Sequence, residues 1–145
     1  MMSRIGPKNT KPEMIIRKGL HSLGFRYRLH VKELPGCPDL VLKKYQTAVF
    51  IHGCFWHAHD GCRFFRLPKT NTSFWATKLD GNRKRDIDVT NSLLKSGWRV
   101  LRIWECAIRV MPINKIIELI ASWVLGNYQS GSFSEATIQF NTNQT

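Results

Sequence analysis

The chain has 145 residues, enough for one domain with a buried core and too few for two comfortable ones. Its 22 Lys and Arg against 10 Asp and Glu give a formal net charge of +12, and 21 of these basic residues lie within residues 1–110, which favours a nucleic-acid partner for the core of the chain. No segment has the ~18 apolar residues of a membrane span, the N-terminus has no signal-peptide core, and the four cysteines do not resemble a secreted disulfide framework, so we expect a cytoplasmic protein.

Periodicity and turn residues predict a mixed series of helices and strands. In chain order these are a helix over 10–23, strands over 25–29, 39–42 and 47–51, helices over about 73–79 and 82–95, a strand over 98–104 and a helix over 111–125. Thr10 followed by Glu13 is a helix-capping pattern, and Gly24 ends that helix. The order predicts one α/β domain over residues 1–126, followed by a polar C-terminal tail, 127–145, that we expect to be mobile.

The region from His52 to Cys62 contains three of the five histidines and two of the four cysteines. Imidazole and thiolate are the usual zinc ligands. If the strand ending at Trp104 lies beside the strand ending at Ile51, one imidazole and three thiolates can form a closed, structural site. The expected ligands are Cys54, His59, Cys62 and Cys106, with His57 and Asp60 as competing ligands and ordinary buried thiols as the alternative.

A second group of polar residues has the composition of a hydrolytic metal site. Asp39 opens an apolar strand, and its hard carboxylate oxygen suits magnesium, with carbonyls, waters and phosphate oxygens completing the shell of a metal-dependent nuclease. His52 and His57 are candidate acid–base groups, and Asp86 could fix an imidazole tautomer. The alternatives are a turn-forming role for Asp39 and a solvated helix face for Asp86.

Large aromatic side chains lie beside these polar groups. Phe55 and Trp56 fall inside the zinc-binding loop, and Trp75 follows it. Such groups on the loops of a basic domain can wedge between bases and unstack them. Core packing is the alternative, and it is the role we expect for Phe74.

Together these residues resemble the very-short-patch repair (Vsr) family of DNA mismatch endonucleases, from about residue 2 to 109. The matching blocks are Thr10-Lys-Pro-Glu13, Pro35-Gly-Cys-Pro-Asp39, Phe50-Ile-His-Gly-Cys-Phe-Trp-His57, Pro68-Lys-Thr-Asn71, Arg85-Asp86 and Gly97-Trp-Arg-Val-Leu-Arg-Ile-Trp-Glu-Cys106. The resemblance implies a single-domain, restriction-endonuclease-like α/β fold, with a mixed central sheet flanked by helices and a structural zinc site. Phe50-Ile51-His52 stands where enzymes of this fold usually carry Glu-x-Lys or Asp-x-Lys, as in the Vsr branch.

The same resemblance implies roles for individual residues. Asp39 and the main-chain carbonyl of Ile51 would hold the catalytic Mg²⁺. His57, with Asp86 beside it, would help to activate water. The remaining implied assignments are His52 and Glu13 as supporting catalytic or phosphate contacts, Cys54, His59, Cys62 and Cys106 as the structural Zn²⁺ ligands, and Phe55, Trp56, Trp75, Met2, Arg4, Lys8 and Lys69 as DNA contacts.

Members of this family nick DNA on the 5′ side of the T in a T:G mismatch, which arises when 5-methylcytosine deaminates. The resemblance therefore implies a Mg²⁺-dependent, strand-specific endonuclease for double-stranded DNA, a monomer functionally linked to a cytosine-5 DNA methyltransferase. A T:G pair stacks and pairs less well than a matched pair, so opening the duplex there requires less free energy. Two other hypotheses are open: a zinc-stapled DNA-binding module without cleavage activity, and a restriction-type endonuclease. The N-terminal arm that precedes the first block in relatives is expected to be curtailed.

Overall fold

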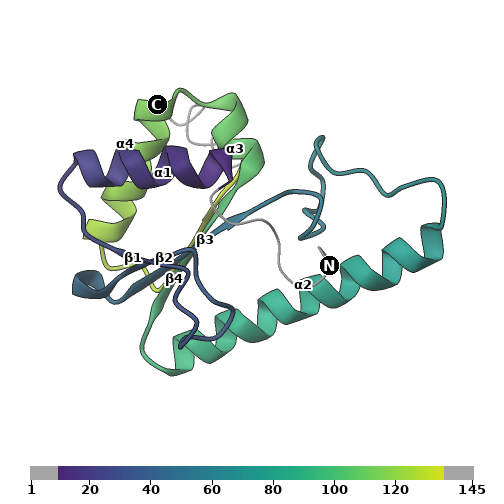
Figure 1. Cartoon of the computed structure of the whole chain (residues 1–145), viewed down its shortest axis with the longest axis horizontal. Coiled ribbons are helices and arrows are strands. Elements are labelled where there is room, and N and C mark those ends of the chain that lie inside the picture. Colours follow the sequence, from purple (N-terminus) through teal and green to yellow (C-terminus); the bar gives the residue numbers. More distant parts are fainter. Residues whose placement is uncertain (1–9, 136–145) are drawn as a thin grey trace.

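A five-stranded sheet separates two helical layers in the computed structural model, which describes residues 10–135. Helices α1, α3 and α4 lie on one face of the sheet, and the long helix α2 lies on the other (Figure 1). The elements are α1 (Lys11–Ser22), β1 (Arg28–Leu29), β2 (Leu40–Leu42), the 3-10 turn η1 (Lys43–Tyr45), β3 (Thr47–His52), α2 (Thr72–Lys95), β4 (Arg99–Trp104), α3 (Glu105–Val110), α4 (Ile113–Leu125) and β5 (Ser130–Phe133). Among the helices in this described range, none combines the length and apolar character needed to cross a bilayer.

The sheet is mixed and has the strand order β1-β2-β3-β4-β5. The pairs β1–β2 and β2–β3 are antiparallel, as expected for the hairpin, whereas β3–β4 and β4–β5 are parallel. Ile51 pairs with Ile103 and His52 with Trp104, so the carboxyl ends of β3 and β4 meet at one edge. This edge brings the loop after β3 next to α3, as the zinc hypothesis requires.

Side chains alternate along β3 and β4 and fill a core on each face of the sheet. On one face, the core against α1 and α4 contains Val49, Leu101 and Ile103. On the other face, the core against α2 contains Ala48, Phe50 and Val100. Burying one such Val, Leu, Ile or Phe side chain contributes roughly 1.5–3 kcal/mol. Both faces of these strands are covered, which explains their nearly continuous apolar sequences.

The observed helices match the prediction from the sequence at α1 and differ from it at α2 and α3. The N–H of Glu13 donates to Oγ1 of Thr10 at 3.4 Å, and Gly24 follows the helix with a φ of 95°, which confirms the expected cap and end. The two helices expected over 73–95 are one continuous helix of 24 residues. A single glycine lowers the stability of a helix by only ~1 kcal/mol relative to alanine, so the helix can continue through Gly81. The short helix α3 was not expected.

The chain after residue 126 contributes a strand where only a tail was expected. β5 pairs in parallel with β4, and Phe133 is 9% exposed. A Cβ on Gly131 would stand 2.4 Å from Nε1 of Trp123, so glycine permits this close approach. Ser-Gly-Ser-Phe has little strand propensity of its own, and its pairing with β4 and contact with α4 override that weakness. The sheet therefore extends beyond the expected domain boundary; residues 136–145 of the expected tail lie outside the described residues.

Candidate active site and metal centre

Two carboxylates from different elements come together near the start of β2. Asp39 precedes β2, and its Oδ2 accepts the main-chain N–H of Ile51 on β3 at 2.8 Å. Glu13 on α1 is 2% exposed and pairs through Oε2 with Nε2 of His30 at 2.7 Å. Ligand atoms of Glu13, His30 and Asp39 all lie within 4.8 Å of one another. The antiparallel pairing of β1, β2 and β3 creates this arrangement, since it sets residues 30, 39 and 51 side by side.

Burial makes the Asp39 carboxylate a poor place for an uncompensated negative charge. Desolvation raises the pKa of Asp39 from 3.8 to about 6; the Ile51 N–H opposes the rise, and the nearby Glu13 adds to it. A bound cation would offset the desolvation and the repulsion between the two carboxylates. The pair therefore has the charge and donor type of a site for a hard divalent cation.

The imidazoles of His52 and His57 stack at the carboxyl end of β3, with ring centroids 3.7 Å apart and planes within 1°. Nδ1 of His57 lies 2.7 Å from Oδ2 of Asp86 on α2, so this helix carboxylate contacts an imidazole and is not simply solvated. Burial, followed by the nearby charge of His57, lowers the pKa of His52 well below its usual value, which keeps this imidazole neutral. Nδ1 of His52 is buried with no hydrogen-bond partner within residues 10–135, a feature typical of functional sites.

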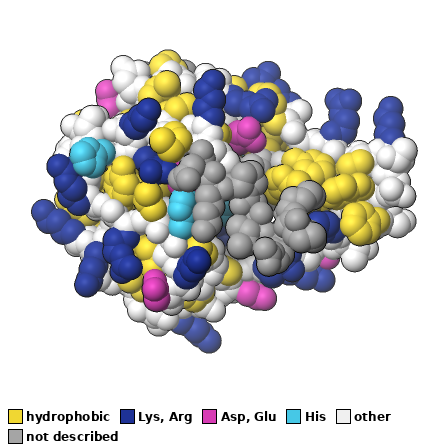
Figure 2. Space-filling view, viewed as in Figure 1, with side chains coloured by type: hydrophobic (Ala, Val, Ile, Leu, Met, Phe, Trp, Pro, Cys, Tyr) yellow, Lys and Arg dark blue, Asp and Glu magenta, His cyan; other side chains and the backbone are white. Residues whose placement is uncertain are grey.

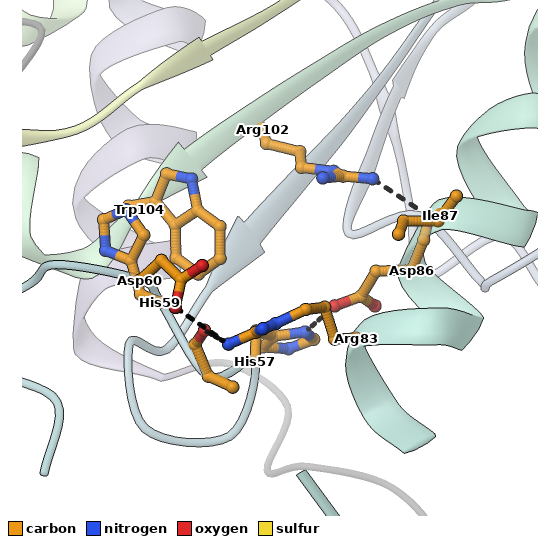
Figure 3. Close-up of a pocket in the computed structure, with 9 residues that line it drawn as sticks. His57, His59, Asp60, Arg83, Asp86, Ile87, Arg102 and Trp104 are labelled. Carbon is orange, nitrogen blue, oxygen red and sulfur yellow. Dashed lines mark hydrogen bonds and ion pairs between the residues drawn. The ribbon is translucent and has the colours of Figure 1, made fainter. Parts of the chain in front are cut away.

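A pocket lies beside the His57–Asp86 pair and is lined by the loop after β3, by α2 and by β4 (Figure 3). Two arginines form hydrogen bonds between the segments that line this pocket. Arg83 donates to the carbonyl of Ala58 at 2.7 Å, and Arg102 donates to the carbonyl of Asp86 at 2.9 Å. These bonds fix the loop and α2 relative to the sheet, so they also fix the distance between His57 and Asp86.

Four ligand atoms meet at the junction of the loop after β3 with α3. The atoms belong to Cys54, His59, Cys62 and Cys106 and lie within 4.8 Å of one another. Sγ of Cys106 is 3.6 Å from Nδ1 of His59. Three thiols and one imidazole, with no further ligand in this group among residues 10–135, are the donor set of a closed tetrahedral zinc site.

The surroundings of this cluster also fit zinc thiolates. The N–H of Glu135 donates to Sγ of Cys106 at 3.3 Å, and burial raises the pKa of the Cys54 and Cys106 thiols. A bound Zn²⁺ would reverse that rise and deprotonate the thiols. Burial lowers the pKa of His59, which keeps it in the neutral form that binds metal, and its ring stacks on Trp104 with centroids 3.8 Å apart.

The residues proposed as alternative zinc ligands lie outside this group. His57 pairs with Asp86, and the 88% exposed side chain of Asp60 pairs with Arg83 at 3.2 Å. Cys37 is also outside it and has a φ of 51°, a left-handed value typical of turn residues.

An aromatic cluster extends from the loop after β3 to the start of α2. Trp75 lies 5.5 Å from Phe55 and 6.0 Å from Trp56, measured between ring centroids. Trp56 is 37% exposed, and Phe74 is 59% exposed, so the expectation that Phe74 packs in the core is wrong. Figure 2 shows hydrophobic side chains gathered where α2 begins, with Lys and Arg side chains around them. Lys69 is exposed in the loop leading to this cluster.

Three candidate DNA contacts, Met2, Arg4 and Lys8, lie outside the described residues. Conversely, the sequence alone did not single out His30, Arg83 or Arg102, which contact Glu13, Asp60 and Asp86, respectively. Of these three, only His30 could have been found from the sequence. If the expected strand over 25–29 pairs with the strand after Asp39, residue 30 falls beside Asp39.

The sequence is similar to proteins of one enzyme family. A family model described as DNA mismatch endonuclease Vsr matches residues 1–63. The chain is 45% identical over 108 residues to the type II nicking enzyme V.XorIIP of Xanthomonas oryzae pv. oryzae, which is 74% of this chain and 79% of that protein. It is 37% identical over 128 residues to the DNA mismatch endonuclease Vsr of Escherichia coli K12, covering 86% of this chain and 81% of the relative. The chain belongs to the Vsr family of DNA mismatch endonucleases.

A further relative, the type II nicking enzyme V.NmeAIP of Neisseria meningitidis serogroup A, is 48% identical over 109 residues, covering 75% of this chain and 77% of that protein. As a Vsr family member the chain is a DNA endonuclease, a hydrolase of phosphodiester bonds associated with mismatch repair. The family has a restriction-endonuclease-like fold, which agrees with the mixed sheet flanked by helices. Its nuclease chemistry calls for a divalent metal, and the Cys/His cluster could hold zinc.

Proposed function

We propose that this Vsr family member is a Mg²⁺-dependent, strand-specific endonuclease that nicks DNA on the 5′ side of the T in a T:G mismatch. The observation that carries the proposal is the position of Asp39. Its partly buried carboxylate accepts the main-chain N–H of Ile51, beside Glu13 and on the same sheet edge as the His57–Asp86 pair. The relatives named as nicking enzymes support cleavage of one strand.

In this proposal Asp39 and the carbonyl of Ile51 hold Mg²⁺. The ion, when bound, polarises the scissile phosphate and stabilises the negative charge that develops on its oxygens. The carboxylate of Asp86 holds Nδ1 of His57 as an N–H donor, which leaves Nε2 of His57 free to accept a proton from the attacking water. His52 stacks against His57 in the neutral form and limits its rotation, and Glu13 supports the cation site.

Zn²⁺ has a structural role in this proposal and takes no part in the reaction. The ligands Cys54, His59, Cys62 and Cys106 leave no coordination position for water. By fixing the loop after β3, the zinc centre holds both His57 and the aromatic cluster in place.

The aromatic cluster provides the mismatch selectivity. Phe55, Trp56 and Trp75 form a contiguous group with partly exposed rings, and such rings can enter a base step and unstack it. Unstacking costs a few kcal/mol per step and costs least at a mismatch. T:G sites are therefore opened more readily than T:A sites, and Lys69 with Met2, Arg4 and Lys8 supplies further DNA contacts.

The cellular setting follows from the substrate. T:G mismatches arise where 5-methylcytosine deaminates, so we propose that the enzyme acts in the cytoplasm, on the nucleoid, alongside a cytosine-5 DNA methyltransferase. A single catalytic cation site and a single aromatic cluster within residues 10–135 suit a monomer that cuts one strand. Residues 1–126, with β5 added from the next segment, form the nuclease domain.

The deciding experiment compares nicking of a labelled T:G duplex with its T:A control, with and without Mg²⁺, in several methylation-site sequence contexts. We expect a Mg²⁺-dependent nick beside the mismatched T, and no nick by Asp39→Ala with zinc content unchanged. Tight T:G binding without a nick would favour the zinc-stapled binding module. Equal cleavage of both duplexes would favour a restriction-type enzyme.

A further inference from the structure

One partly buried histidine has no role in the proposed reaction and yet contacts both carboxylate-bearing residues of the cation site. Nε2 of His30 lies 2.7 Å from Oε2 of Glu13. The main-chain N–H of His30 donates to the main-chain carbonyl of Asp39 at 3.0 Å. His30 therefore contacts α1 through its side chain and the residue before β2 through its backbone.

The environment of this contact shields it from water. The side chain of His30 is 14% exposed and that of Glu13 is 3% exposed, so solvent hardly competes for the 2.7 Å contact between Nε2 and Oε2. His30 also has a φ of 47°, in the left-handed region that few non-glycine residues adopt. Backbone strain of this kind persists where neighbouring contacts fix the residue, and it is concentrated at functional sites.

We infer that His30 is a positioning residue for the divalent cation: it holds Glu13 of α1 at a fixed distance from Asp39 and so sets the spacing of the two carboxylates. The inference rests on the proposed function, in which Asp39 binds the cation. Glu13 also pairs with Arg17 at 3.5 Å, but Arg17 lies on the same helix and moves with it. Of these two partners, His30 is the one that connects α1 to the segment bearing Asp39, just before β2.

A matched set of substitutions separates this role from simple packing. His30→Asn suits the left-handed backbone but is too short to reach Glu13, and His30→Gly, which has no strain at this φ, is a second loss variant. His30→Gln carries an amide nitrogen at roughly the distance of Nε2 and should restore the contact. His21→Gln changes an exposed histidine elsewhere on α1 and is the control.

Two measurements report the affinity for the cation. One is the Mn²⁺ concentration that gives half-maximal T:G nicking, and the other is direct Mn²⁺ binding to the zinc-loaded protein, measured by electron paramagnetic resonance. For His30→Asn and His30→Gly we expect both the half-saturating concentration and the Mn²⁺ dissociation constant to rise ~10-fold or more, the usual effect of losing a partner that orients a metal ligand. His30→Gln should stay within about threefold of the parent, and His21→Gln should match it. Zinc content should be unchanged in all four variants.

The inference is overturned if His30→Asn and His30→Gly bind Mn²⁺ as the parent does, or if His30→Gln is as defective as they are. Asp39→Asn distinguishes this failure from failure of the proposed function. Retained Mn²⁺ binding in Asp39→Asn would disprove the assignment of the cation site to Asp39. Lost binding in Asp39→Asn, with normal binding in the His30 variants, would disprove only the positioning role of His30.

Discussion

At the scale of single residues, Asp39 illustrates a conflict between function and stability. Burial raises the pKa of Asp39 to about 6, so the folded state binds a proton more tightly than the unfolded chain, whose value is 3.8. The free energy of unfolding that this group contributes therefore falls as the pH rises from about 4 to about 6, and it stays low at neutral pH. The carboxylate lies where it destabilises the fold in the absence of a cation, as expected for a residue kept for binding one.

Asp39→Asn should therefore abolish nicking without destabilising the protein. At pH 7.5 and without divalent cations, we expect its free energy of unfolding to exceed that of the parent by about 1–3 kcal/mol, because the neutral amide avoids the cost of burying a charge. At pH 4 the difference should be close to zero, since the carboxyl is then largely protonated. Urea denaturation at the two pH values measures both quantities. A variant less stable than the parent at pH 7.5 would mean that the ionised carboxylate makes a net stabilising contact.

At the scale of elements, local signals in the sequence predicted only part of the fold. The capping residue Thr10 and the two apolar runs of the β2–β3 hairpin carry their information within a few positions, so the ends of α1 and the hairpin were predictable. The continuity of α2 and the pairing of β5 depend on contacts between distant segments. The four residues of the Cys/His cluster could be grouped because of their residue types. The contact of Asp86 with His57 depends on the packing of α2 against the loop, so the family resemblance implied it and local signals did not.

Two glycines in these elements should respond oppositely to alanine. Gly81 lies inside α2, where an added Cβ meets nothing closer than 3.8 Å, so Gly81→Ala should raise the free energy of unfolding by about 0.5–1 kcal/mol. Gly131 lies against the ring of Trp123, so Gly131→Ala should lower it by about 1–3 kcal/mol through overpacking. Chemical denaturation of both variants measures the difference. Destabilisation by Gly81→Ala would contradict the uninterrupted helix.

At the scale of the whole molecule, the Cys/His cluster that could hold zinc joins segments that are far apart in the sequence. Cys54 follows β3, Cys106 lies on α3, and the segment after β5 reaches the same point, where Glu135 donates its N–H to Cys106 and pairs with Arg63 at 2.8 Å. Trp104 connects this centre to the active site, because its ring stacks on His59 and meets that of His52 edge-on at 5.2 Å. Zinc should therefore control the geometry of the catalytic imidazoles as well as stability.

Replacing Cys106 with serine tests this coupling. Losing a ligand of a closed zinc site removes metal-linked folding free energy, so we expect Cys106→Ser to lose more than about 4 kcal/mol of stability and to melt roughly 10 °C or more below the parent. Because the loop carrying His57 and Trp56 would then be released, nicking should fall further than duplex binding, which also depends on the basic surface. Cys37→Ser is the control, since Cys37 lies outside the cluster and its loss should leave zinc content unchanged. Metal analysis, calorimetry and nicking on the same preparations would decide the question, and a Cys106→Ser protein that keeps zinc and melts with the parent would exclude this residue as a ligand.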